Sequence, residues 1–154
     1  MIEIVVVLLL MGILAATVLG RSITTSNLDL NSATDKIRNQ LRFAQAEAMK
    51  RSDTAWGINS SGPEYWLFRN TTANEVRIPG GDYPGAGNRI NKSDLGAGVT
   101  ISNFTVYFDR IGKPYTAYTS PTVNTPLASQ MSITVSAGGD NRTITVTPET
   151  GLIR

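Results

Sequence analysis

The sequence predicts an α+β protein, in which a long N-terminal α-helix with a membrane-spanning first half packs through its second half on an antiparallel β-sheet domain. Three observations lead to this fold class. Residues 4–19 carry no charge, residues 30–48 hold apolar residues three or four positions apart, and the chain from residue 54 onward breaks into short β-branched or aromatic segments. The expected organisation is a hydrophobic helix over 1–20, its amphipathic continuation over 21–53 and a globular β domain over 54–154.

The composition favours a structural protein over a catalytic one. The chain has 154 residues, enough for one domain with a hydrophobic core, and its 14 basic and 12 acidic residues give a net charge of +2. It contains no Cys and no His, which excludes thiolate nucleophiles, imidazole bases and Cys/His zinc sites. Because the acidic residues are scattered singly, we expect no enzyme, no cofactor and no metal.

The uncharged run Ile4–Leu19 is short for a membrane span. As a helix it would extend about 24 Å, against about 30 Å of bilayer hydrocarbon. Three interpretations compete: a cleaved secretory signal, a plain membrane anchor, and a helix that leaves the membrane to enter a protein assembly. Glu3 stands where a signal peptide carries basic residues, which disfavours the first. In the third, a carboxylate among apolar groups needs a cation as its partner, and a neighbouring subunit would supply it.

The second helical segment has one narrow apolar stripe on an otherwise polar surface. Leu30, Ala33, Ile37, Leu41, Ala44 and Ala48 form the stripe, and Asp35, Arg38, Arg42, Gln45 and Lys50 lie off it. Between the two segments, Gly20 and the stretch "SITTSN" have low helix propensity, so we expect a weak, kinked or melted joint there. Together the segments would extend roughly 75 Å, more than this domain can cover, so lipid or other subunits must bury the apolar half.

From Thr54 onward the sequence predicts a series of short strands. They are "TAWGIN", "EYWLFR", "VTIS", "FTVYFD", "MSITVSA" and "RTITVTP". The last two are expected to form a hairpin around Gly138, Gly139, Asp140 and Asn141. Residues 79–98, with six Gly and two Pro, are expected to be the longest loop, either functional or a variable surface connection. At strand spacing the larger aromatic residues belong in the core rather than on a ligand platform; they are Trp56, Trp66, Phe68, Tyr107 and Phe108.

The first fifty residues resemble the N-terminal helix of type IV pilins and type II secretion pseudopilins. Ile2 and Glu3 match that family's Ile-Glu pair, and Gly12 matches a Gly about nine residues later. "LRFAQAEAMKR" resembles a segment of the minor pilins that include pseudopilin H and the FimT-type subunits, with Gln45 in place of the usual Arg. "EYWLF", "VYFDRIGKP" and "ITVTPETGLIR" resemble later segments of the same group.

The resemblance implies a structural minor subunit of a type II secretion pseudopilus or a type IV pilus. Such a subunit is held in the bacterial inner membrane by one span, with its domain in the periplasm, and then joins other pilin or pseudopilin subunits in a filament. Glu3 would pair with the N-terminal amine of a neighbouring subunit, and Gly12 would be a second assembly contact. The family is processed by a prepilin peptidase after a basic leader; this chain has no leader and starts two residues short of the expected mature end, so we expect its start to be truncated or misassigned.

The alternative is a DNA-binding minor pilin. FimT-type subunits with DNA-uptake roles carry a Gly-Arg-x-Arg-like end, of which this chain keeps Gly151 and Arg154 but has Leu152 in place of the first Arg. A basic patch could combine Arg154, Arg142, Arg110 and Lys113. The missing Arg and the low net charge disfavour DNA as a partner. A calcium site is disfavoured too, because the spacing of the candidate ligands matches no calcium loop; they are Asp82, Asp94, Asp109 and Asp140.

Overall fold

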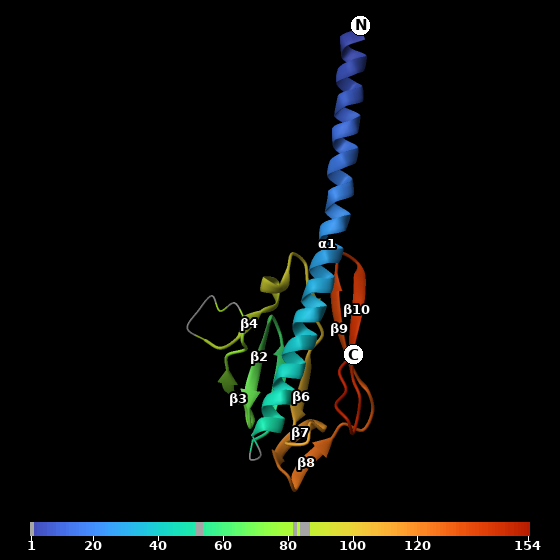
Figure 1. The fold of residues 1–154 in the computed structure, drawn as a ribbon. Coiled ribbons are helices and arrows are strands. Elements are labelled where there is room, and N and C mark those ends of the chain that lie inside the picture. The colour runs from blue at the N-terminus through green and yellow to red at the C-terminus, as the bar shows by residue number, and fades with distance from the viewer. Residues whose placement is uncertain (1, 52–53, 82, 84–86) are drawn as a thin grey trace.

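The computed structural model describes residues 2–51, 54–81, 83 and 87–154, with the side chains of 16–26 left out. One long helix, α1 (Ile2–Lys50), carries a β domain around its second half, while its first half projects from the domain (Figure 1). The described strands are all paired antiparallel and form two sheets. The predicted α+β class, with a helix packed on antiparallel sheet, is confirmed.

The larger sheet contains seven of the described strands in the order β3-β2-β1-β6-β7-β8, with β4 paired to β2. Its strands are β1 (Trp56–Ser61), β2 (Glu64–Arg69), β3 (Thr71–Val76), β4 (Ile90–Asn91), β6 (Phe104–Phe108), β7 (Pro114–Ser120) and β8 (Val123–Pro126). The smaller sheet has the order β10-β9-β5, built from β5 (Thr100–Ile101), β9 (Met131–Ala137) and β10 (Asp140–Val146). A 3₁₀ helix, η1 (Lys92–Leu95), joins β4 to β5.

The helix stripe predicted from the sequence is the contact between α1 and both sheets. All six of its residues are at most 1 % exposed, and α1 packs on β1 and β6 of one sheet and on β9 and β10 of the other. The stripe residues belong to one hydrophobic cluster together with buried residues of both sheets, among them Ile58 of β1 and Ile133 of β9. The core therefore lies between the second half of α1 and the two sheets.

Of the weak, kinked or melted joint expected after Gly20, the melted form is wrong. α1 is a single helix of 49 residues that runs through residues 20–27 without a break. Low helix propensity costs only a few tenths of a kcal/mol per Ser or Thr, while each residue added to an existing helix gains a hydrogen bond. With a good helix on either side, the low-propensity stretch continues the helix.

Four of the five aromatic residues predicted to be in the core are buried, and of these Trp56 and Phe108 belong to the core cluster. Trp56, Trp66, Phe68 and Phe108 are at most 6 % exposed, and Tyr107 is half-buried against the Phe68 ring, 4.7 Å away between centroids. The predicted hairpin is also present, with a shorter turn than expected. Ala137 pairs with Asp140, so Asp140 and Asn141 belong to β10, and Gly138 and Gly139 alone form the turn with φ angles of 60° and 93°. Two successive positive φ angles are what a tight two-residue hairpin turn needs, and Gly adopts them without steric cost.

The loop expected over 79–98 is partly structured. It contains β4 and η1, which bury Ile90, Lys92 and Leu95. Asp82 and residues 84–86 lie outside the described residues.

Candidate functional site

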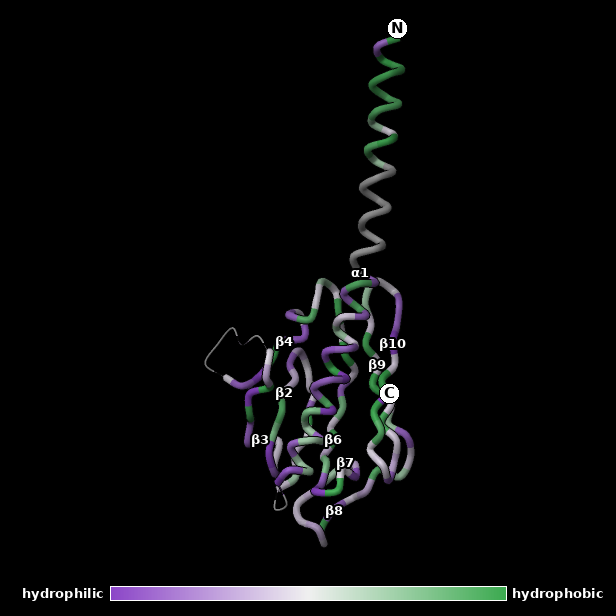
Figure 2. The backbone as a smooth tube through the Cα atoms, in the orientation of Figure 1, coloured by the Kyte–Doolittle hydropathy of each residue, from purple (hydrophilic) through white to green (hydrophobic). Residues whose placement is uncertain are grey.

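The described part of the projecting helix is apolar around its whole circumference. Every large apolar side chain between Ile2 and Leu14 is 52–80 % exposed, and Figure 2 shows this end of α1 as hydrophobic and clear of the domain. A helix that is apolar all round is normally covered by protein or lipid, and apolar surface of this extent marks an interaction site. Within the described residues, no helical stretch is both long and apolar enough to cross a membrane.

Both predicted assembly contacts lie on this projecting segment. Glu3 is exposed in the first turn of α1, where the positive end of the helix dipole favours a carboxylate. Gly12 has no atom within 4 Å of the place where a Cβ would be, so the subunit itself does not require glycine there. Nine residues advance an α-helix by about two and a half turns, so Glu3 and Gly12 lie on opposite faces of α1.

Three separate segments of the chain meet where α1 ends in the domain. The Gln45 amide nitrogen donates to the main-chain carbonyls of Gly112, at 2.9 Å, and Gly151, at 3.1 Å. The Arg42 guanidinium donates to the carbonyl of Ile153 at 3.0 Å. We call this set of contacts the C-terminal junction. These five residues come from the segments "LRFAQAEAMKR", "VYFDRIGKP" and "ITVTPETGLIR", so the three motifs are parts of one contact.

The two glycines of the C-terminal junction allow a close approach of backbones. Gly112 and Gly151 have φ angles of 80° and 61°, which side chains disfavour. A Cβ on Gly151 would lie 2.2 Å from the Gly112 carbonyl oxygen and 2.5 Å from Nε2 of Gln45. The segment that follows returns along β10, where the Arg154 and Thr145 backbones exchange two hydrogen bonds of 3.0 Å. The chain is therefore tied to α1 and to β10 at the same place.

Asp109, a candidate calcium ligand from the sequence, instead organises the turn between β6 and β7. Its Oδ1 accepts hydrogen bonds from the backbone N–H groups of Ile111 and Lys113, both at 2.9 Å, and its Oδ2 accepts one from the Tyr115 hydroxyl at 2.9 Å. Burial and the Asp109 carboxylate raise the pKa of Tyr115 to about 12. Within the described residues, no group of three or more acidic side chains is placed to hold a metal ion.

The same turn borders a cavity of about 350 Å³. Arg110, Ile111, Tyr115 and Tyr118 line it together with Thr54, Asp109 and Pro121. The two tyrosine rings meet edge to face, 5.2 Å apart between centroids. Figure 1 places β7 and β8 at the end of the domain opposite the projecting helix, so this cavity is at the far end of the molecule. The sequence reasoning missed it, because its residues come from a turn, a strand and a loop with no common motif.

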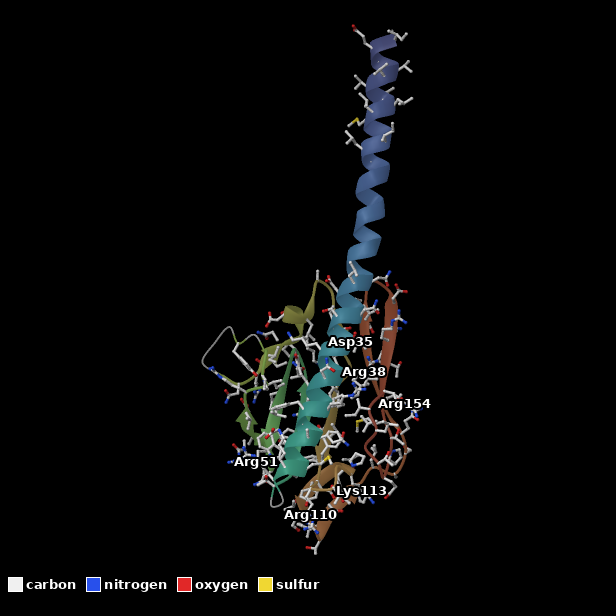
Figure 3. The ribbon with its side chains drawn as sticks, in the orientation of Figure 1. Asp35, Arg38, Arg51, Arg110, Lys113 and Arg154 are labelled. Atoms are coloured by element: carbon white, nitrogen blue, oxygen red, sulfur yellow. The ribbon has the colours of Figure 1, made fainter. Side chains whose placement is uncertain are left out.

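The four residues predicted as a basic patch are not gathered at one point. Figure 3 shows Arg110 and Lys113 at the far end of the domain and Arg154 higher on its side. Arg142 is exposed near the start of β10. Lys113 forms an ion pair with Glu149, 2.7 Å away, which offsets its charge. DNA binding through these residues stays a prediction.

The comparisons with known proteins give one structural likeness. No protein-family model matches the chain, and no curated protein does. The crystal structure of the type IV minor pilin FimU from Pseudomonas aeruginosa (strain PAO1) superposes on it with a TM-score of 0.47 and 14 % sequence identity. The superposition covers 80 % of this chain and 90 % of that one.

Proposed function

We propose that this chain is a structural, non-enzymatic subunit of a filament: a minor pilin or pseudopilin of the type IV pilus and type II secretion superfamily, related to pseudopilin H and the FimT-type subunits. The observation that carries the proposal is the first half of α1, which exposes apolar side chains on every face while the second half is built into the domain. An assembly made by packing such helices against each other would bury that surface.

The proposal places residues 1–20 in the bacterial inner membrane before assembly, with the domain in the periplasm after processing by a prepilin peptidase. In the filament, Glu3 pairs with a cationic group of a neighbouring subunit, which we take to be its N-terminal amine. Removing one partner of a buried ion pair costs roughly 3–5 kcal/mol, so a subunit in the wrong axial register is disfavoured. Because Gly12 lies on the face opposite Glu3, it contacts a different neighbour, where the missing side chain permits a close helix approach.

The C-terminal junction supports this role because it fixes the domain to the helix. The hydrogen bonds of Arg42 and Gln45 tie α1 to the turn before β7 and to the last residues of the sequence. The apolar stripe of α1 packs on both sheets along the same stretch. A domain held in this way keeps one orientation on its helix, so the position of the helix in a filament sets which surface the domain presents.

The proposal is tested by placing a charge on the projecting helix. In cells of the species that encodes the chain, filaments are sheared from the surface or isolated from the envelope, and the subunit is detected with an antibody to its domain. Leu9→Lys, on a side chain that is 62 % exposed, should lower the amount in filaments at least tenfold, because a lysine inside a helix bundle costs several kcal/mol.

The control is Thr71→Lys, which adds the same charge to the exposed start of β3. It should enter filaments like the unmodified chain. Normal incorporation of Leu9→Lys, with the protein present at normal amounts, would overturn the proposed assembly through α1.

A further inference from the structure

The side chain of Lys92 is buried in the domain. Lys92 is the first residue of η1 and is only 7 % exposed, which is rare for a lysine without a carboxylate partner. Its backbone N–H donates to the Pro63 carbonyl at 2.8 Å, which holds the start of η1 against the turn between β1 and β2. The side chain then runs toward the connection between β5 and β6.

The ammonium group of Lys92 has only neutral partners among the residues that the structure describes. Nζ donates to the main-chain carbonyl of Ile101 at 3.0 Å and to Oδ1 of Asn103 at 3.2 Å. No described carboxylate lies within ion-pair distance of it. An ammonium group has one more N–H donor than these two acceptors use. A buried charge without a counter-charge is costly, and burial lowers the pKa of Lys92 accordingly.

Lys92 and both partners of its ammonium group, Ile101 and Asn103, line a cavity of about 310 Å³. Its polar wall consists of Asn91, Lys92, Ser93, Thr100 and Asn103, and its apolar wall of Gly62, Pro63, Val99 and Ile101. Hydroxyl and amide groups can donate hydrogen bonds to an anion while the lysine supplies the charge. No acidic residue lines the cavity among those that the structure describes.

We propose that this cavity is a binding site for a small oxyanion, a sulfate, phosphate or carboxylate group, with Lys92 as its charged partner. The bound anion accepts one hydrogen bond from the remaining N–H group of Lys92. It accepts others from the side chains of Ser93, Thr100 or Asn91. Since η1, β4 and β5 meet at this cavity, the anion ties the connection 90–103 together and stabilises the domain. The site is separate from the projecting helix and does not depend on the proposed assembly.

The test is the thermal unfolding of the full chain in a non-ionic detergent, with sulfate, phosphate or acetate added and chloride as the control at equal ionic strength. At about tenfold the dissociation constant, the preferred oxyanion should raise Tm by about 3 °C above the chloride value. Lys92→Met should lose this rise, and Lys50→Met, which removes the same charge from an exposed position, should keep it. The oxyanion that gives the largest rise identifies whether the site takes an inorganic anion or a carboxylate.

A second pair of variants keeps the test decisive if Lys92→Met does not fold. Ser93→Glu puts a carboxylate at the wall of the cavity, so it should raise Tm at low salt and lose the response to added oxyanion. Ser93→Gln has the same size without the charge and should respond like the unmodified chain. The inference is overturned if no oxyanion acts differently from chloride, if Lys92→Met responds fully, or if Ser93→Glu and Ser93→Gln respond alike.

Discussion

The side-chain amide of Gln45 donates a hydrogen bond to the main-chain carbonyl of Gly151, 3.1 Å away, and so joins α1 to a residue 106 positions later in the chain. The same nitrogen also donates to the carbonyl of Gly112 at 2.9 Å. One side chain therefore satisfies two backbone carbonyls that come from different parts of the domain. The amide is suited to this position because it donates without bringing a charge that would need its own partner.

Replacing Gln45 should weaken the domain measurably. Gln45→Ala leaves two partly buried carbonyls without their donor, and we expect a loss of about 1–3 kcal/mol in the free energy of unfolding. Urea unfolding of the full chain in non-ionic detergent measures this free energy. Gln130→Ala, at an exposed position, is the matched control and should change the stability by less than about 0.5 kcal/mol. Equal effects of the two variants would show that the two hydrogen bonds of Gln45 contribute nothing to stability.

Gly151→Ala should be more harmful than the same change at a glycine with free space around it. Its added methyl group would meet the Gly112 carbonyl oxygen at 2.2 Å, and its φ of 61° is already unfavourable for alanine. Gly62 has nearly the same φ, 57°, but no atom lies within 4 Å of the place where its Cβ would be. Gly62→Ala therefore introduces backbone strain without a steric clash. We expect Gly151→Ala to lose at least about 1–3 kcal/mol more than Gly62→Ala. A comparison of urea midpoints decides this, and similar midpoints would contradict it.

The Tyr115 hydroxyl should make the domain sensitive to alkaline pH. Burial and Asp109 raise the pKa of Tyr115 to about 12, above the unfolded value of about 10. The neutral form is favoured in the folded state, so its contribution to stability is complete below pH about 10 and is lost as the pH rises toward about 12.

Tyr115→Phe should flatten this part of the curve of Tm against pH, measured from pH about 9 to about 11.5. Tyr65 is fully buried and its pKa is also raised to about 12. Its titration therefore leaves part of the fall of Tm with pH in the variant. At neutral pH the variant should lose the hydrogen bond to Asp109, about 1–3 kcal/mol. An unchanged slope in Tyr115→Phe would show that this hydroxyl does not titrate in the range.

DNA binding should be weak or absent at moderate salt. The four predicted cations do not gather at one point, and Glu149 offsets the charge of Lys113. Tight phosphate contacts need clustered Lys and Arg, and their affinity falls steeply with salt. Gel-shift assays at low and moderate salt measure this, with Arg110→Ala and Arg154→Ala as the variants. Retardation at moderate salt that either variant abolishes would restore the DNA-binding alternative.

The sequence predicted those parts of the fold that have a periodic pattern. The stripe from Leu30 to Ala48 follows the 3.6-residue helix period, and "EYWLFR" and "MSITVSA" became β2 and β9 with the predicted bounds. Strands β3, β4, β7 and β8 were missed. β3 and β8 are mostly exposed edge strands with no alternation of apolar and polar residues, and β4 has only two residues. β7 begins with Pro114 and is buried only at its first two residues.

The contacts between distant segments were beyond local patterns. Spacing alone does not bring Gln45 to Gly112 and Gly151, which lie 67 and 106 positions later in the chain. The burial of Lys92 could not be predicted, because lysine is among the residue types that are rarely buried. Glu3 and Gly12 were read from resemblance, and what they contact stays a prediction.

The most direct test of the proposed function is the incorporation of Glu3 variants into filaments. Glu3→Gln keeps the size of the side chain and removes its charge, and Glu3→Ala removes the charge together with most of the side chain. The control Glu149→Gln removes a carboxylate charge from the domain, at a side chain that is 71 % exposed. The amount of each variant in isolated filaments is compared with its amount in whole cells, and its Tm is measured in detergent. We predict that both Glu3 variants fold with an unchanged Tm and enter filaments at least tenfold less than Glu149→Gln; normal incorporation of Glu3→Ala would contradict the account.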